Sequence, residues 1–237
     1  MLSAARNPRP VEQYLATELA AGRIAGPFLR SEVPLVQVSR FGVIPKKNGE
    51  WRLILDLSSP PHRSVNDGIN PQLCSVQYPT VDQAIAHILG LRPGAMLAKV
   101  DIAHAFRNIP VHPEDRHLLG MSWGGKVYLD LTLPFGLRSS PKIFTAVADA
   151  LEWTFLKQGV SWSTHYIDYF LTMGQPDTTE CRDNLELILR TCEWLGVPLK
   201  REKIEGPSAV LTFLGIALDT ERREIRLPEQ KLEELKA

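Results

Sequence analysis

Two aspartates, Asp101 and Asp168, have the residue type and the surroundings for chemistry on a phosphate-bearing substrate. Asp101 follows the apolar run MLAKV of residues 96–100, and Asp168 lies within STHYIDYFLTM, residues 163–173. Carboxylates on adjacent strands can hold Mg²⁺, which prefers oxygen ligands and shares its coordination shell with substrate phosphates. Two such ions about 4 Å apart activate an attacking hydroxyl and stabilise a leaving pyrophosphate. On the pair alone, ordinary aspartates at a strand end and in a turn are the commoner interpretation.

Cysteine and histidine spacing argues against other kinds of site. Cys74, Cys181 and Cys192 are far apart in the sequence, and their odd number argues against a disulfide framework. We therefore expect a reducing compartment. Five histidines show no metal-ligand spacing with one another or with cysteine, and surface or core positions suit them better: His62, His87, His112, His117 and His165.

Length and charge bound the class of protein. The 237 residues, of which 44% are hydrophobic, suffice for one large domain or two small ones with a buried core. Lys plus Arg and Asp plus Glu are both 27, whereas a nucleic-acid binder is usually basic, so only a local basic groove is compatible with such a partner. No run of about 18 apolar residues predicts a membrane span, and the N-terminus lacks a signal-peptide pattern. An intracellular location, cytoplasmic or nuclear, is expected.

Turn signals predict three hairpins that would position the aspartates. Asn48-Gly49 and Gly124-Gly125 each separate two strand-like runs, and both dipeptides tolerate the positive φ of a tight turn. Asp168 lies near the tip of the third hairpin. The predicted hairpins cover residues 41–57, 118–133 and 163–173.

Apolar periodicity predicts the remaining elements. Ser140 and Pro141 suit the start of a helix that Gly159 can end, and its apolar stripe consists of Phe144, Val147, Leu151 and Phe155. Residues 58–80 are predicted as a long loop. Further helices are expected over residues 11–21, 81–91 and 179–195, and strands over 96–102 and 213–219. This mixture of hairpins and helices predicts an α+β fold with an antiparallel sheet.

Five segments in a fixed order resemble the motifs of reverse transcriptases, from about Leu35 to Asp219. The likeness is strongest to reverse transcriptases of retrotransposons of the DIRS-like and LTR types. LPFGL followed by SP, and YID at this spacing, are specific in combination. The five segments are VIPKKNGEWRLILDL, KVDIAHAFRNIPV, LPFGLRSSPKIF, HYIDYF and FLGIALD.

The resemblance implies a right-hand polymerase fold, with fingers and a palm built on an antiparallel sheet. It assigns residues 35–219 to fingers and palm and residues 1–34 to an N-terminal helical lead-in. Residues 220–237 would begin a thumb or connection, so the thumb is truncated. The chain then resembles a fragment of a polyprotein, whose parent could carry a ribonuclease H downstream.

The resemblance also implies roles at the reaction centre. Asp101 and Asp168 would ligate Mg²⁺ or Mn²⁺, with the carbonyl of Ile102 as a further ligand. The backbone N–H groups of His104 and Ala105 would face the triphosphate.

Around that centre, the resemblance assigns contacts with the dNTP, the template and the primer. Phe106 would exclude a 2′-OH, although ordinary core packing also explains a phenylalanine there. Phe135 and Gly136 would touch the templating base and the nucleotide, and Leu214 and Gly215 would support the primer end.

Cations complete the implied site. Lys46, Lys47 and Arg52 match the residues that clamp a triphosphate, because Arg suits bidentate phosphate contacts; a solvated charged hairpin is the alternative. Lys203 matches a lysine that can protonate the departing pyrophosphate, although many surface lysines look the same.

Tyr169 departs from the pattern of the family. The box YxDD reads Tyr166-Ile167-Asp168-Tyr169 here, so a phenol replaces one carboxylate. A tyrosine with its ordinary pKa near 10 supplies no negative charge at neutral pH. The resemblance implies RNA-directed DNA polymerase activity on a primed RNA or DNA template, impaired by Tyr169. The alternatives are a non-catalytic nucleic-acid-binding remnant and a pseudogene product.

Overall fold

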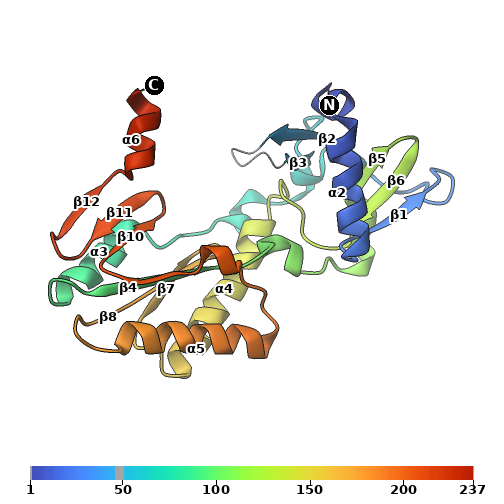
Figure 1. Cartoon of the computed structure of the whole chain (residues 1–237). Coiled ribbons are helices and arrows are strands. Elements are labelled where there is room, and N and C mark those ends of the chain that lie inside the picture. The colour runs from blue at the N-terminus through green and yellow to red at the C-terminus, as the bar shows by residue number, and fades with distance from the viewer. Residues whose placement is uncertain (1, 46–50, 237) are drawn as a thin grey trace. The chain divides into compact units, whose positions relative to one another are not determined.

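The computed structural model describes residues 2–45 and 51–236, which form two compact units. The first unit contains Met1–Val76 and Ala105–Phe144, and the second contains Gln77–His104 and Thr145–Ala237. Figure 1 labels helices and strands of both units where there is room. Among the described residues, no helix is long and apolar enough to cross a membrane.

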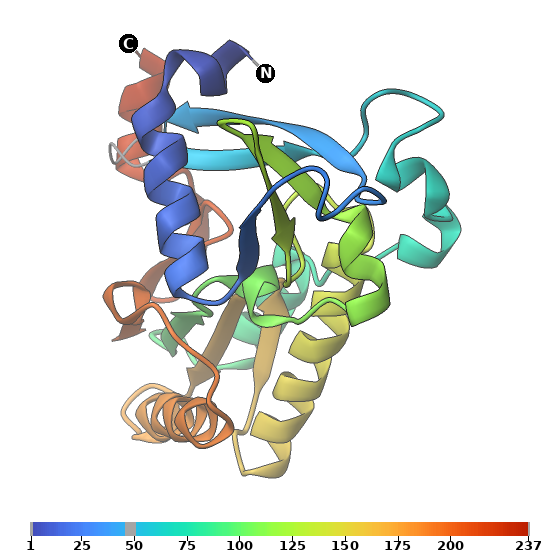
Figure 2. The ribbon, with the colours of Figure 1, turned by 90° about the vertical axis from the view of Figure 1, so that its right-hand side faces the viewer.

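The first unit is built on a five-stranded sheet in the order β1-β6-β5-β2-β3. Its pairings are antiparallel except for β2 with β5, which run parallel. Helix α2 packs on β1 and β3 and is drawn in blue in Figure 2. The strands are β1 (Ile24–Phe28), β2 (Val38–Pro45), β3 (Trp51–Asp56), β5 (Gly120–Trp123) and β6 (Lys126–Asp130). The helices are α1 (Leu2–Arg6), α2 (Pro8–Ala20) and the 3₁₀ helices η1 (Val65–Gly68), η2 (Pro71–Cys74), η3 (Ala105–Asn108) and η4 (Pro113–Leu118).

The two hairpins predicted in this unit are confirmed. Pro45 pairs with Trp51, so β2 and β3 flank the predicted turn at Asn48-Gly49, which itself lies outside the described residues. Gly124 and Gly125 connect β5 to β6 with φ values of 56° and 74°. These positive angles are the reason that a Gly-Gly pair suits this turn.

The second unit is built on a four-stranded antiparallel sheet in the order β7-β8-β4-β9, beside a smaller sheet β10-β11-β12. The strands of the larger sheet are β4 (Met96–Asp101), β7 (Ser163–Tyr166), β8 (Tyr169–Gly174) and β9 (Glu205–Ser208). The smaller sheet contains β10 (Val210–Phe213), β11 (Ile216–Asp219) and β12 (Glu224–Arg226). The helices are α3 (Val81–Gly90), α5 (Glu180–Leu195), η5 (Arg201–Lys203) and α6 (Glu229–Lys236), while α4 (Ser140–Lys157) begins in the first unit and continues in the second.

Side chains along the strands of the larger sheet point alternately to its two faces, and other elements cover both faces. Leu97 shares one face with Leu171 and packs in a core with residues of α3, β10 and β11. On the other face, Phe170 meets Phe155 of α4 edge to face at 5.3 Å. Helix α5 packs along β8 and β4 (Figure 1). The sequence therefore yields the predicted α+β fold with an antiparallel sheet.

One predicted element is wrong: residues 213–219 are a hairpin and not a single strand. Strand β10 ends at Phe213, Leu214 and Gly215 turn with φ of 48° and 79°, and Phe213 pairs back onto Ile216. Apolar residues lie on both sides of the turn, so hydrophobicity alone does not reveal it. Gly215 was the local signal for the reversal, because a glycine inside a strand pattern often marks a break.

Two smaller details also differ from the patterns. The predicted loop of residues 58–80 contains η1 and η2, which begin after the capping residues Ser64 and Asn70. Val147 in the predicted stripe of α4 is 36% exposed, whereas the other three members are buried.

Candidate active site

Asp101 is the last residue of β4, and its side chain is fully buried. It lies on the same face of the sheet as Leu97 and Lys99, because alternate residues of a strand share a face. In the strand register Asp101 pairs directly with Tyr169, the first residue of β8. The residue after the predicted YID sequence is therefore the cross-strand neighbour of this carboxylate.

Two lysines bind the Asp101 carboxylate. Lys200 Nζ donates to Oδ1 at 2.7 Å, and Lys203 Nζ donates to Oδ2 at 2.8 Å. These charge-assisted bonds offset the cost of burying an anion. They also mean that each carboxylate oxygen already has a cationic partner.

Asp168 lies in the turn between β7 and β8, where Ile167 has a φ of 54°. Its backbone carbonyl accepts a hydrogen bond from the N–H of Ile102 at 2.9 Å, which ties the hairpin tip to the end of β4. Burial raises the pKa of the Asp168 carboxyl above its usual value, and the charge of Asp101 raises it further. Lys200 Nζ lies 3.9 Å from Oδ2 of Asp168 and acts in the opposite direction.

The backbone of Ile102 faces the hairpin tip. Ile102 pairs with Leu199 in an antiparallel bridge whose hydrogen bonds are made by the flanking residues Asp101 and Ala103. In such a pair, the N–H and C=O of the central residue both point away from the partner strand. The Ile102 carbonyl is therefore directed to the side on which Asp168 lies.

Tyr169 joins this cluster through its hydroxyl. The Tyr169 oxygen accepts a hydrogen bond from Lys203 Nζ at 3.1 Å, and the ammonium lies 5.4 Å from the centre of the tyrosine ring. Lys203 thus bridges Asp101 and Tyr169. Its hydrogen bond to Asp101 raises the pKa of Lys203 above its usual range, so the side chain is a cation at neutral pH.

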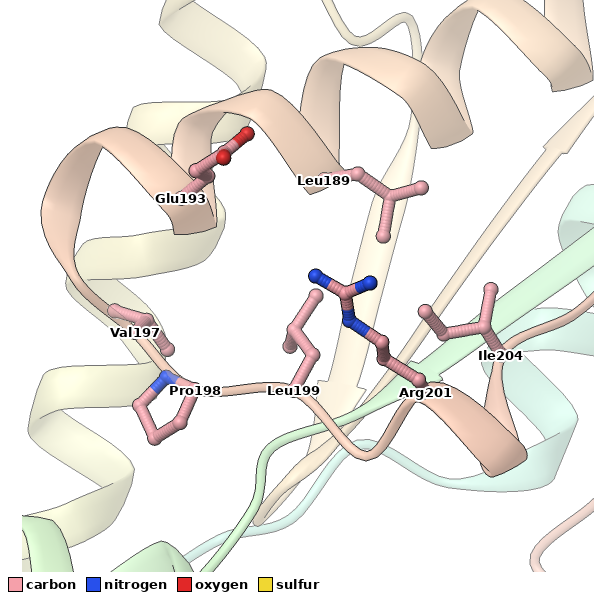
Figure 3. A pocket seen from close by; sticks show the side chains of 7 residues that line it. All are labelled: Leu189, Glu193, Val197, Pro198, Leu199, Arg201 and Ile204. Carbon is pink, nitrogen blue, oxygen red and sulfur yellow. The ribbon is translucent and has the colours of Figure 1, made fainter.

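The segment that carries the lysines is itself held on β4. Ala103 donates to the carbonyl of Pro198, and Lys200 donates through its backbone to the carbonyl of Asp101, both at 2.8 Å. A pocket of about 510 Å³ lies between this segment and the C-terminal half of α5. Figure 3 shows Arg201 extending from the segment toward α5, beside Leu189 and Leu199.

The chemistry of these donors fits a divalent cation that prefers oxygen. The carboxylates of Asp101 and Asp168 and the carbonyl of Ile102 are hard oxygen ligands of the kind that Mg²⁺ selects. Among the described residues, however, no group of three or more acidic, histidine or cysteine side chains gathers to hold a metal. The two lysines further neutralise the two aspartates, so the electrostatic attraction for such an ion is reduced.

The turn after β4 has a strained backbone. His104 and Ala105, predicted to face a triphosphate with their N–H groups, have φ values of 63° and 36°. Left-handed conformations of residues other than glycine cost of order 1–3 kcal/mol each and gather at functional sites. Their geometry is therefore consistent with the predicted role, which stays a prediction.

Three further predicted residues lie together in the first unit. Phe106 is 8% exposed, and its ring centre lies 5.3 Å from that of Phe135, which is 48% exposed. Gly136 has a φ of 100°, and a Cβ there would lie 2.4 Å from the backbone oxygen of Leu55. This position therefore admits only glycine without backbone movement. The proposed contacts with base and nucleotide remain predictions.

Asn66 is a residue that the sequence patterns did not single out. Its buried amide donates to the carbonyl of Gly136 and to Ser58 Oγ, both at 2.8 Å, and its oxygen accepts from the N–H of Arg138 at 2.8 Å. Asn66 thereby positions the Phe135-Gly136 turn. Asn66 lies in the predicted loop, where no periodicity or spacing could have marked it.

The remaining predicted site residues divide between described and undescribed parts of the chain. Lys46 and Lys47 lie outside the described residues, as does the side chain of Arg52, whose backbone pairs with Ile44. Leu214 and Gly215 form the β10–β11 turn. Lys200 was missed by sequence reasoning, and its only signal was its position three residues before Lys203.

Comparison with known proteins identifies the family. The family model described as reverse transcriptase (RNA-dependent DNA polymerase) matches residues 44–218. The Pro-Pol polyprotein of feline foamy virus is 29% identical over 197 residues, which is 82% of this chain and 16% of the polyprotein. The Pro-Pol polyprotein of simian foamy virus type 1 is 29% identical over 224 residues, covering 91% of this chain and 18% of that one. The chain thus spans less than a fifth of these relatives.

Solved structures support the same assignment at the level of the fold. The foamy viral protease-reverse transcriptase dRH in complex with double-stranded DNA has a TM-score of 0.76 at 21% identity, covering 97% of this chain and 36% of that one. The foamy viral protease-reverse transcriptase in complex with an RNA/DNA hybrid has a TM-score of 0.73 at 19% identity, covering 95% and 27%. The polymerase fold predicted from the motifs is therefore confirmed. The chain belongs to the reverse transcriptase (RNA-dependent DNA polymerase) family of nucleotidyltransferases.

Proposed function

We propose that this chain is a reverse transcriptase domain built for RNA-directed DNA synthesis, with an impaired reaction centre. In that reaction a primer 3′-OH attacks the α-phosphate of a dNTP and pyrophosphate leaves. The observation that carries the proposal is the hydrogen bond from the N–H of Ile102 to the backbone carbonyl of Asp168. This bond holds both predicted carboxylates at one end of the sheet. The partners are a primer with an RNA or DNA template, and the parent polyprotein would carry a ribonuclease H downstream.

Asp101, Asp168 and the Ile102 carbonyl would hold Mg²⁺ or Mn²⁺ in this proposal. Two such ions, when bound, activate the attacking hydroxyl and neutralise charge on the phosphates. The protein's own part is positioning and electrostatic stabilisation. The N–H groups of His104 and Ala105 would orient the triphosphate.

Side chains would complete the selection and the clamping of the nucleotide. Phe106 would exclude a sugar that carries a 2′-OH. Lys46, Lys47 and Arg52 would contact the phosphates, and Phe135 with Gly136 would contact the templating base.

Lys203 is the proposed proton donor to the departing pyrophosphate. It carries a proton at neutral pH because its hydrogen bond to Asp101 raises its pKa. The same bond works against proton transfer, since a good general acid has a pKa near the working pH. The Asp101 bond would therefore have to break before Lys203 could act.

The impairment follows from charge at the site. Tyr169 replaces a carboxylate directly across from Asp101, and Lys200 and Lys203 bind both oxygens of that aspartate. The two aspartates and the two bound ammonium groups give a formal charge of zero, whereas a third carboxylate beside the same lysines would leave a negative charge that attracts divalent ions more strongly. Weak metal binding and slow nucleotide incorporation are expected.

Primer extension by the unmodified chain tests the proposal. With a radiolabelled primer and Mg²⁺ or Mn²⁺, we expect slow addition of single nucleotides. The Asp101→Asn variant, which keeps the size of the side chain, should abolish that residual addition. Robust synthesis by the unmodified chain would contradict impairment, and undiminished synthesis by Asp101→Asn would contradict the assigned site.

A second candidate function is nucleic-acid binding without turnover. The specific observation in its favour is that Lys200 and Lys203 pair with both oxygens of Asp101, so this carboxylate has cationic partners without any metal ion. Binding of a primer–template with no incorporation under any metal condition would favour this candidate over a slow polymerase.

A further inference from the structure

A buried ionic cluster in the first unit connects α2 to the turn that bears Phe106. Arg107 donates to Glu18 Oε2 from Nε at 3.0 Å and from Nη2 at 2.7 Å, and to Asp130 Oδ1 from Nη1 at 2.5 Å. Arg23 donates to Glu18 Oε1 at 2.6 Å. The side chains of Arg107, Glu18 and Asp130 are 5%, 8% and 2% exposed. Two cations and two anions balance the charge.

The pKa directions agree with an ionised cluster at neutral pH. Burial raises the pKa of Glu18, but the hydrogen bonds from Arg23 and Arg107 outweigh burial, so the net pKa is lowered. Burial raises the pKa of Asp130 to about 6, which still leaves it ionised at pH 7. An arginine that lost one of these partners would leave an unpaired buried charge, which is costly.

Arg107 directly follows Phe106 in η3. Its third guanidinium contact, to the carbonyl of Thr132 at 3.3 Å, adds a further link to the segment after β6. Because Arg107 is bound on two sides, η3 cannot rotate without breaking several charge-assisted bonds. The ring of Phe106, which packs against Phe135 and Phe144, is fixed along with it.

The first residue of η3 requires such support. Ala105 has a φ of 36°, and a strained backbone persists only where the surrounding structure holds it. Arg107 lies two residues away and supplies that hold. Glu18, in turn, comes from α2, which precedes residues 44–218 that match the family model. A contact from outside the matched residues therefore reaches Arg107, the residue next to the proposed nucleotide-selecting Phe106.

We propose that Glu18 is a positioning residue: through Arg107 it holds the Ala105-Phe106 turn in place and thereby sets discrimination between dNTP and rNTP. This inference rests on the proposed function, in which Phe106 excludes a 2′-OH. A purely structural role for the cluster would lower global stability and leave local order and sugar selection untouched.

Hydrogen exchange tests the positioning without requiring any activity. The Glu18→Gln variant keeps the side-chain shape and removes its charge. We expect roughly tenfold faster exchange in residues 105–111, with residues 163–174 of the second unit unchanged. The matched control is Glu12→Gln, at an exposed position on the same helix, which should exchange as the unmodified chain does. Unchanged exchange in 105–111, or equal acceleration in both segments, would overturn the proposal.

If Glu18→Gln fails to fold, Arg107→Lys serves the same purpose. Lysine keeps the charge and loses the planar fork that binds two carboxylates. It should loosen residues 105–111 selectively, with the same two outcomes counting against the proposal.

Sugar discrimination is measured in a Tyr169→Asp background, chosen to raise incorporation. Adding Glu18→Gln should lower the ratio of kcat/KM for dNTP over rNTP roughly tenfold, chiefly through KM. Adding Glu12→Gln should leave the ratio unchanged. A preserved ratio with Glu18→Gln would overturn the inference, whereas absence of any incorporation in the background would count against the proposed function, and hydrogen exchange would still decide the positioning.

Discussion

At the residue scale, Asp101 and its two lysines determine which ions the proposed reaction centre can attract. A buried aspartate needs a cationic partner, and in the proposed function metal ions would supply it. Here Lys200 and Lys203 take both oxygens. Any ion entering the site must therefore compete with bonds that already exist.

Asp168 provides a pH-dependent test of the site. Its raised pKa means that the folded state favours the protonated carboxyl, so ionisation of Asp168 costs stability at neutral pH. The cost is present above the native pKa and disappears as the pH falls toward the ordinary value of 3.8. In chelator, Asp168→Asn should have the higher free energy of unfolding at pH 7, and the difference should shrink on acidification. Urea titrations that find the unmodified chain more stable at pH 7 would contradict this account.

The sequence allowed single residues to be named where a motif combined residue type with a fixed order, and their roles stay predictions. Asp101 and Asp168 could be named because each lies in a distinctive segment, and the structure brings them to the same end of the sheet. Lys200 and Asn66 could not be named, since their roles depend on contacts with residues 99 and 70 positions away. Sequence spacing carries no signal over such separations.

At the element scale, a glycine in a turn can be required for its positive φ alone, or also because another segment packs too closely for a Cβ. Gly136 has a φ of 100° and would bring a Cβ within 2.4 Å of the Leu55 oxygen, whereas Gly125 has a φ of 74° and open space around it. Alanine at either position strains the backbone. Alanine at position 136 would in addition force its own backbone and that of Leu55 apart.

The matched pair Gly136→Ala and Gly125→Ala tests this distinction. Gly125→Ala should cost about 1 kcal/mol of unfolding free energy from backbone strain alone. Gly136→Ala should cost more than about 2 kcal/mol, because a backbone clash adds to the strain. Denaturant titrations with unchanged slopes would measure both. Equal costs would mean that the approach to Leu55 relaxes freely.

The elements themselves were largely predictable, and the exception has a physical cause. Hairpins with Asn-Gly or Gly-Gly turns could be read because those residues accept positive φ. The β10–β11 hairpin was missed because Leu214, an apolar residue, takes a φ of 48° there. Local propensity disfavours that conformation, so tertiary packing imposes it.

At the scale of the whole molecule, the balanced charge gave little indication of a nucleic-acid partner. The five ordered motifs indicated the family instead, and the family model that matches residues 44–218 confirms it. The arrangement of the chain in two units was not readable, because the first unit joins residues 1–76 with 105–144. The periodicity of apolar residues along the sequence does not indicate which distant segments pack together.

Primer–template binding tests the partner at this scale. Contacts between basic side chains and phosphates release counterions, so log K should fall linearly with log salt concentration. Between 50 and 200 mM salt, we expect a loss of affinity of at least tenfold, measured by fluorescence anisotropy. Affinity that does not change with salt would contradict binding through a local basic groove.

Single-turnover nucleotide incorporation by Tyr169→Asp measures whether the missing carboxylate impairs the proposed reaction centre. Aspartate restores a third carboxylate opposite Asp101, whereas the matched Tyr169→Asn variant removes the ring without adding charge. We expect Tyr169→Asp to incorporate dNTP with Mg²⁺ at least tenfold faster than the unmodified chain, and Tyr169→Asn to show no such gain. Equal rates for Tyr169→Asp and the unmodified chain, or equal gains for both variants, would contradict this expectation.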